Sequence, residues 1–470
     1  MIDQVKLESS LRARLPGFEA LVSCQRLSAG ASRETYRITA LIGGAETLLA
    51  LRRSAAGEGS AMKQGPGLSA EASLFSAAHA AGVPGPQVLM MLEPADDLGS
   101  GFLMEWISGE TLGARIARND AFAAIRPKLA RQCGEILGRL HGLDVAAAGL
   151  ERVLDTLTPE ASVRHTYATY LALGVAQPMI DYTAAWLLAN LPSERALGLV
   201  HSDFRNGNFI VSPSDGVVAV LDWELAHIGD PARDLGWICT RSWRFGVTDK
   251  PVGGFGAYDD LFAGYEAVIG RSVDRQAVHF WEVFGSFWWA VGTLSMAQSW
   301  RDGSETSVER PAIGRRSSEC QIDCVNLIIP GPAHRPAEAQ RRLSAAALPR
   351  SNELLESVRN FLSGDLPKSL DGRNAFLARV AANSIDTVLR ELVVGQSALA
   401  HEHALLSLLL GQAGETDALR KKLCEAIASG AVALASPALC QYLRDSVLAQ
   451  VLIDQPGYHG AAEALARAYP

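Results

Sequence analysis

The sequence predicts an α+β protein in which a small β-rich lobe precedes a larger helical lobe, and a further helical region follows. Short β-rich runs alternate with turn residues over residues 19–53. From about residue 112 apolar residues recur at helical spacing. Prolines at 330, 332 and 336 then interrupt the helical pattern before its last stretch. At about 150 residues per domain, the chain is long enough for about three folding units.

The first lobe, residues 1–107, is expected to hold an antiparallel sheet and one helix. Further runs with strand-like composition lie at residues 35–38, 47–51, 87–92 and 101–107. Between them, residues 71–81 are rich in alanine and end before Gly82 and Pro84, which is typical of a helix and its stop signal.

The second lobe, residues 108–332, is expected to be mainly helical. Residues 131–143 place Cys133, Ile136 and Leu140 at three- and four-residue spacing, which is typical of a helix with one buried face. A short hairpin, residues 209–211 and 217–221, interrupts the helices. Such a hairpin inside a helical lobe indicates a functional site.

The remainder is expected to be a linker, residues 333–350, and a helical domain of unknown role, residues 351–470. Glycines at 364, 395, 411 and 430 are interpreted as breaks between its helices.

Composition excludes several classes of function. The formal net charge is −8 and no block of like charges offers a cationic stripe, so we expect no nucleic-acid partner. Residues 283–300 carry no charge, but Ser286 and Gln298 make them a poor membrane span, so we expect a buried helix and no membrane partner. The first residues do not resemble a secretion signal and the seven cysteines are sparse, which predicts a cytoplasmic protein with reduced thiols.

The residues that indicate chemistry lie between positions 199 and 237. His201, Asp203, Arg205 and Asn208 share one short loop before the hairpin, and Asp222 follows the hairpin. An amide oxygen and a carboxylate are oxygen ligands that Mg²⁺ accepts beside water and phosphate, so the loop predicts a Mg-nucleotide site. Unrelated loop residues are the alternative. A metal-dependent hydrolase is less favoured, because the further ligands of a two-metal site are missing.

These motifs carry a resemblance to a known family. H-x-D-x-x-x-x-N at 201–208 and D-W-E at 222–224 resemble the aminoglycoside phosphotransferase and choline kinase-like family. LDWELAHIGDPARDL, residues 221–235, is most similar to the kinase-like module linked to acyl-CoA dehydrogenases. The resemblance covers roughly residues 15–330 and implies a bilobal protein-kinase-like fold. It implies Asp203 as catalytic base and Arg205 as the cation facing the transferred phosphate. It also implies Asn208 and Asp222 as magnesium ligands.

The same resemblance implies a nucleotide clamp in the first lobe, with ATP and Mg as cofactors. Residues 27–36 would cover the phosphates, through Gly30 and Ser32. Arg52 occupies a position where the family often has lysine, and Glu71 would be its partner. Arginine is bulkier than lysine and binds phosphate with two parallel donors, so the two are not interchangeable. Backbone groups of Glu105 and Ile107, in the connection between lobes, would face adenine.

The expected function is therefore an ATP- and Mg-dependent kinase that phosphorylates a hydroxyl of a small molecule. The linked dehydrogenases suggest a hydroxyacyl-CoA, whereas the wider family includes aminoglycosides, choline and sugars. Arginines over residues 240–330 favour an anionic or neutral acceptor. The alternative is a nucleotide-binding regulatory or scaffold protein with little turnover, because of Arg52 and the glycine-poor loop. The last domain resembles an uncharacterised helical domain, for which a protein partner is a hypothesis.

Overall fold

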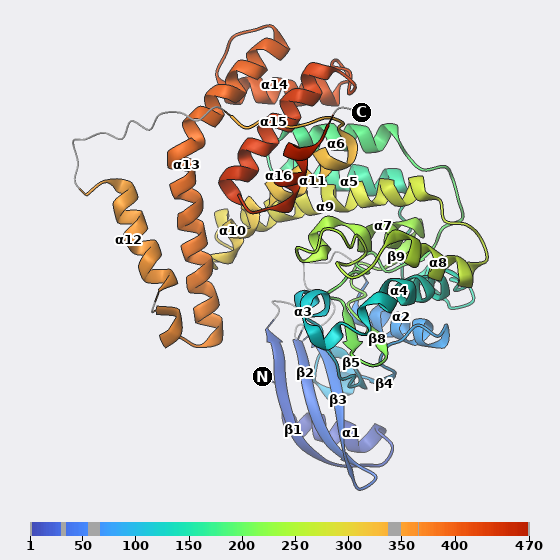
Figure 1. Cartoon of the computed structure of the whole chain (residues 1–470). Coiled ribbons are helices and arrows are strands. Elements are labelled where there is room, and N and C mark those ends of the chain that lie inside the picture. The colour runs from blue at the N-terminus through green and yellow to red at the C-terminus, as the bar shows by residue number, and fades with distance from the viewer. Residues whose placement is uncertain (1, 30–33, 55–65, 337–348, 365, 469–470) are drawn as a thin grey trace. The chain divides into compact units, whose positions relative to one another are not determined.

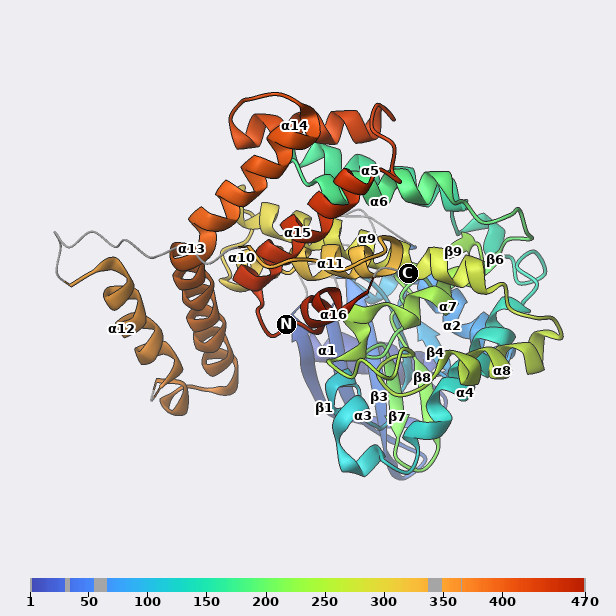
Figure 2. The same ribbon diagram turned by 45° about the horizontal axis from the view of Figure 1, so that its top comes forward.

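The computed structural model describes residues 2–29, 34–54, 66–336, 349–364 and 366–468. The chain divides into two compact units, the first made of residues 1–159 and 192–282 and the second of residues 160–191 and 283–470. Figures 1 and 2 show the elements of both. The sequence-based limits at 107, 332 and 350 divide the chain in another way and stay predictions. Most of the predicted linker lies outside the described residues.

The first unit begins with an antiparallel sheet. Its strands are β1 (Phe18–Ala29), β2 (Glu34–Ile42), β3 (Ala45–Ser54), β4 (Val88–Met91) and β5 (Ser100–Glu105), in the order β1-β2-β3-β5-β4. The sheet predicted from the β-rich runs is thus confirmed. A helix that we did not predict, α1 (Gln4–Arg14), packs Leu7 and Leu11 against it, both fully buried. Asp3 caps this helix by accepting from the backbone of Val5 and Lys6.

Helix α2 (Leu68–Ala80) packs Phe75 against Phe102 of β5. Beside Phe102, Gly101 lets β5 lie close to β3: a Cβ atom there would be 2.4 Å from the carbonyl oxygen of Arg52. Only glycine avoids that clash. The register pairs Arg52 with Phe102, which places the arginine in a central strand of the sheet.

Helices and two small sheets complete the first unit. Its helices are α3 (Gly113–Arg118), α4 (Arg126–His141), α7 (Ala232–Cys239), α8 (Tyr258–Ile269) and the start of α9 (Arg275–Arg301), with 3₁₀ turns η1 (Pro94–Asp96), η2 (Asp120–Phe122), η3 (Leu150–Arg152) and η4 (Arg241–Arg244). Strand β6 (Gly198–Val200) pairs with β9 (His227–Gly229), and β7 (Phe209–Ser212) pairs with β8 (Gly216–Val220) as the predicted hairpin. Helices α4 and α8 pack closely at Gly134, where a Cβ atom would be only 2.0 Å from the backbone oxygen of Leu261. Glycine has no Cβ atom and therefore allows this approach.

The second unit is helical. It contains the rest of α9 and the helices α5 (Pro159–Ala172), α6 (Pro178–Ala189), α10 (Glu309–Arg315), α11 (Ser317–Ile328), α12 (Ser351–Ser363), α13 (Gly372–Leu410), α14 (Thr416–Ala428), α15 (Pro437–Asp454) and α16 (His459–Ala466), with the 3₁₀ turn η5 (Leu366–Ser369). The predicted break at Gly395 is wrong, because α13 runs through it for 39 residues. One glycine costs a helix only about 1 kcal/mol, which the long apolar neighbouring segments outweigh.

The apolar stretch from Val283 lies inside α9, where Val283, Phe284 and Phe287 are buried. In the part of the chain that the structure describes, no helix combines the length and apolar character needed to cross a membrane. On α12, by contrast, Leu354, Val358 and Phe361 are exposed at a spacing of one helical face. A protein partner for this region stays a prediction.

Candidate active site

The predicted catalytic loop connects β6 to β7 and is anchored by a buried carboxylate. Asp234 of α7 accepts the backbone N–H groups of His201 and Ser202, each at 2.8 Å, and lies 3.1 Å from His141 Nε2. Ser202 has φ +67°, a conformation that a non-glycine residue rarely adopts. Asp234 is fully buried, and burial alone would raise its pKa, but the donors from His141 and the loop outweigh this and lower the pKa. The anchor therefore stays charged at neutral pH.

His201 ties the loop to the strand that precedes Asp222. Its Nδ1 accepts the backbone N–H of Asp203 at 3.2 Å, and its Nε2 donates to Leu221 O at 3.0 Å. The side chain is fully buried, and burial lowers its pKa. A neutral ring with one donor and one acceptor satisfies both contacts. His201 is thus a brace for the loop.

The carboxylate of Asp203 has three donors. Its Oδ1 accepts from Arg205 Nε and from Trp237 Nε1, both at 2.9 Å. Its Oδ2 accepts from Asn208 Nδ2 at 2.5 Å. The carboxylate is therefore held by charged and neutral donors together, and its side chain is 14% exposed. A group that must receive a proton from a ligand needs this combination of fixed orientation and access.

Asp222 and Asn208 adjoin each other through the hairpin, because Leu221 N donates to Asn208 O at 2.9 Å. Asp222 also has φ +67°, and its side chain is 34% exposed. The side-chain nitrogen of Asn208, Nδ2, donates to Asp203. The side-chain oxygen of Asn208, Oδ1, is therefore the atom that could take a ligand. An amide oxygen and an exposed carboxylate are hard donors that fit Mg²⁺. These two residues would hold the ion.

Arg52 lies between two carboxylates. Its Nε is 3.0 Å from Glu71 Oε1 of α2, a charge contact rather than an aligned hydrogen bond, and its Nη2 donates to Asp222 Oδ1 at 3.3 Å. Glu71 is completely buried. Burial opposes the charge of Arg52, but Glu71, Asp222 and Glu224 together raise its pKa. The expected partnership of Arg52 and Glu71 is therefore present, and its role towards a nucleotide stays a prediction.

The remaining predicted residues belong to the first lobe. Glu105 ends β5 and Ile107 follows it, both half-buried. Glu105 exchanges two contacts with Gln87: its backbone N–H donates to Gln87 O, and its carboxylate accepts from Gln87 N, each at 3.1 Å. The contact of the Glu105 and Ile107 backbone groups with adenine stays a prediction. Gly30 and Ser32 lie outside the described residues.

Two tryptophans were not assigned to the site by the sequence. Trp237 donates to Asp203, and Trp243 lies under the guanidinium of Arg205, whose Cζ is 4.5 Å from the ring centroid. The signal for Trp237 was its spacing from Asp234, because residues three apart share one helix face. Trp243 follows α7 in η4, and no local pattern could have indicated its position under Arg205.

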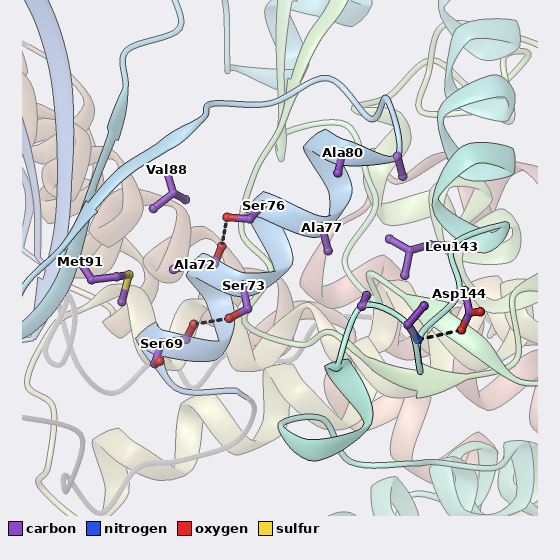
Figure 3. A pocket seen from close by; sticks show the side chains of 13 residues that line it. Ser69, Ala72, Ser73, Ser76, Ala77, Ala80, Val88, Met91, Leu143 and Asp144 are labelled. Carbon is purple, nitrogen blue, oxygen red and sulfur yellow. Dashed lines mark hydrogen bonds between the residues drawn. The ribbon is translucent and has the colours of Figure 1, made fainter.

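A separate hollow of about 800 Å³ lies over the outer face of α2 (Figure 3). Ser73 and Ser76 line it, but their hydroxyls donate to the carbonyls of Ser69 and Ala72 in their own helix. The Asp144 carboxylate accepts from the backbone of Ala146 and Ala147. The hollow contains none of the predicted site residues and few free polar groups. The chemistry is therefore assigned to the catalytic loop, despite the size of this hollow.

The sequence profile of the Phosphotransferase enzyme family matches residues 23–270, more than half of the 470-residue chain. The chain belongs to this family. The matched region contains the catalytic loop, Asp222 and Arg52, so the family predicted from the motifs is confirmed. A second profile, of a domain of unknown function named DUF6285, matches residues 368–458 of this phosphotransferase. The predicted uncharacterised C-terminal domain is thus also confirmed.

Curated relatives share the phosphotransferase region. Identity is 29% over 226 residues with acyl-CoA dehydrogenase family member 10 of Mus musculus, covering 45% of this chain and 19% of the relative. Identity is 28% over 242 residues with acyl-CoA dehydrogenase family member 11 of Rattus norvegicus, covering 49% of this chain and 30% of that relative. The match thus spans less than a third of either relative's own length.

A solved structure supports the fold. A candidate aminoglycoside phosphotransferase of Ralstonia eutropha JMP134 matches with a TM-score of 0.56 and 23% identity, over 68% of this chain and 96% of that chain. At this identity the likeness shows the fold alone. Together with the sheet and helices described above, it confirms the predicted kinase-like fold of this phosphotransferase.

Proposed function

We propose that this phosphotransferase transfers a phosphoryl group from Mg-ATP to a hydroxyl of a small molecule. The observation that carries the proposal is the Arg52 guanidinium, which contacts the buried Glu71 on one side and Asp222 on the other. Asp222 is in turn linked through Leu221 to His201 and Asn208 of the catalytic loop. A cation, a candidate metal-binding carboxylate and the loop that carries the candidate base are therefore connected through these contacts.

Each residue can be given a role on this basis. Mg-ATP would supply the phosphoryl group and a metal ion that offsets its charge. Asp203 would accept the proton of the acceptor hydroxyl at Oδ2, while Asn208 and Asp222 would hold the ion with their oxygen atoms. Arg52 and Arg205 would bind phosphate oxygens, because planar guanidinium donors match them in pairs.

The two candidate carboxylates are paired with the arginines that would bind phosphate. Arg205 contacts Asp203 and Arg52 contacts Asp222. Binding would therefore exchange partners: the arginines would turn to phosphate oxygens, and Asp222 would turn to the ion. ATP without magnesium would leave Asp222 facing a triphosphate. We therefore expect magnesium and ATP to strengthen each other's binding.

For the acceptor we propose an anionic or neutral molecule, with a hydroxyacyl-CoA as the first candidate. The support is the relatedness to proteins named acyl-CoA dehydrogenase family members and the cationic Arg205 of the loop. A polycationic acceptor would meet repulsion from this side chain.

The test is ATP consumption by the full chain with magnesium and a panel of hydroxyacyl-CoAs, aminoglycosides, choline and sugars. Calorimetry compares Mg-ATP binding to the Asp222→Ala variant and to the Asp215→Ala variant. Asp215 lies exposed in the turn of the same hairpin and is a matched control. We expect Asp222→Ala to lose the magnesium dependence and Asp215→Ala to keep it. Equal binding by both variants would remove Asp222 from the site.

The same experiments distinguish the kinase from a second candidate function, a nucleotide-binding scaffold. The observation that favours it is arginine at position 52, where the family often has lysine, because the two side chains are not interchangeable towards phosphate. Tight Mg-ATP binding without consumption for any acceptor would support the scaffold and contradict the kinase.

A further inference from the structure

The indole of Trp237 contacts the candidate base, Asp203, from outside the catalytic loop. Trp237 Nε1 donates to Asp203 Oδ1 at 2.9 Å. The tryptophan is completely buried in α7, the helix whose Asp234 also anchors the catalytic loop. One helix thus fixes the backbone of the loop with one residue and the side chain of Asp203 with another.

The two other donors to Asp203 have additional duties. Arg205 bonds the same oxygen as Trp237, but it would leave Oδ1 when it turns to a phosphate. Asn208 bonds the opposite oxygen, Oδ2, which is the oxygen that must meet the acceptor hydroxyl. After this exchange Trp237 would be the one donor left on Oδ1 among the residues that the structure describes. An indole has one donor and no acceptor, so it cannot take the proton itself.

The surroundings of Trp237 strengthen its indole N–H as a donor to Asp203. The Arg233 guanidinium lies over the rings of Trp237 and Trp281, with Cζ at 6.0 and 5.3 Å from their centroids. Burial lowers the pKa of Arg233 to about 10, which still leaves it cationic at neutral pH. A cation over an indole face withdraws electron density from the ring and so strengthens its N–H as a donor.

We propose that Trp237 is a positioning residue of the phosphotransfer reaction, which holds the Asp203 carboxylate in place through Oδ1 so that Oδ2 faces the acceptor hydroxyl. This inference rests on the proposed function, because it assumes that Asp203 receives the proton. It adds a residue outside the loop motif to the machinery. Trp237 acts through Asp203 and does not touch the acceptor.

The fold supplies a matched control. Trp281 is buried like Trp237, lies under the same Arg233, and donates Nε1 to a carboxylate at 2.9 Å, but its partner is Asp230. Trp281→Phe therefore removes the same kind of hydrogen bond at a position away from Asp203. A loss of stability common to both variants is separated in this way from an effect on Asp203.

The first measurement is steady-state kinetics of the full chain with Mg-ATP and the acceptor that the ATP-consumption panel identifies. For Trp237→Phe we expect kcat to fall about 10- to 100-fold, the worth of one hydrogen bond to a charged group, with KM for ATP unchanged. Trp281→Phe should keep kcat within about twofold. Equal kcat values for the two variants would overturn the inference.

The second measurement needs no turnover. A ¹H–¹⁵N spectrum of the indole groups has nine tryptophan side chains to resolve. The Trp237 signal, assigned by its loss in Trp237→Phe or by selective labelling, should move in Asp203→Asn, whereas the Trp281 signal should stay. An unmoved Trp237 signal would overturn the inference. A wild-type protein that consumes no ATP would instead contradict the proposed function and leave this spectral result to decide the contact.

Discussion

The catalytic loop and helix α13 are built in opposite ways. In the loop, Ser202 adopts φ +67°. The buried polar groups of the loop have partners from distant parts of the chain: Ser202 N bonds Asp234, and His201 Nε2 bonds Leu221 O. In α13, 39 residues keep one regular conformation, and even Gly395 does not interrupt it. Strained backbone persists only where surrounding contacts hold it, which is typical of functional sites. The contrast indicates that local preference determines α13, whereas tertiary contacts determine the loop.

The largest effect is expected for the candidate base in the loop. Asp203→Asn keeps the size of the side chain but removes its ability to accept a proton, so turnover should fall about 10²- to 10⁴-fold. Mg-ATP affinity should remain, because in the proposed mechanism Asp203 would face the acceptor. Steady-state kinetics and calorimetry measure the two quantities. Wild-type turnover would show that the loop has been assigned the wrong chemistry.

Arg52 should give the next largest effect. If Arg52 binds phosphate as proposed, Arg52→Ala would remove charge-assisted hydrogen bonds and should weaken Mg-ATP binding about 10- to 100-fold while lowering turnover. Arg52→Lys retains the charge and should keep part of both. A lower melting temperature in Arg52→Ala with unchanged Mg-ATP affinity would instead mean that Arg52 has a structural role.

Stability should depend on pH through the histidines around the loop. Burial lowers the pKa of His201 and lowers that of His227 to about 3, so the folded state binds fewer protons than the unfolded chain. The free energy of unfolding should therefore fall as pH decreases below about 6.5, the ordinary histidine value. Urea unfolding between pH 7.5 and 5 measures this dependence.

A substitution at His227 tests the source of that dependence. His227→Gln should flatten the curve relative to wild type, whereas the same change at the exposed His459 should not. An identical pH dependence in wild type and His227→Gln would exclude His227 as its origin.

The smallest effect is expected in α13. Gly395→Ala should raise the free energy of unfolding by up to about 1 kcal/mol, because alanine favours helix. The nearest atom, Glu391 Cγ, is 3.3 Å from the new Cβ and belongs to a flexible side chain. Gly411 ends the same helix at φ +63°, so Gly411→Ala should lower stability. Thermal unfolding compares the two variants, and a loss of stability in Gly395→Ala would contradict local control of α13.

The sequence alone predicted several elements of the first unit and the candidate residues of the loop. Strand and helix periodicity predicted the first sheet, α2 and the β7–β8 hairpin, because these depend on side chains that are near in sequence. The motif also indicated Asp203, Asn208 and Asp222 together. It misjudged Gly395, since one weak helix former is outweighed by its neighbours, and it did not indicate α1.

Only the tertiary structure decided how the site is held. The partnership of Arg52 with Asp222 joins residues 170 positions apart. The contact of Trp237 with Asp203 depends on how α7 packs beneath the loop, and the stacking of Arg205 on Trp243 depends on the turn after that helix. Such contacts arise from the packing of whole elements. Composition and spacing carry no information on that packing, since it is determined by long-range burial and hydrogen bonding.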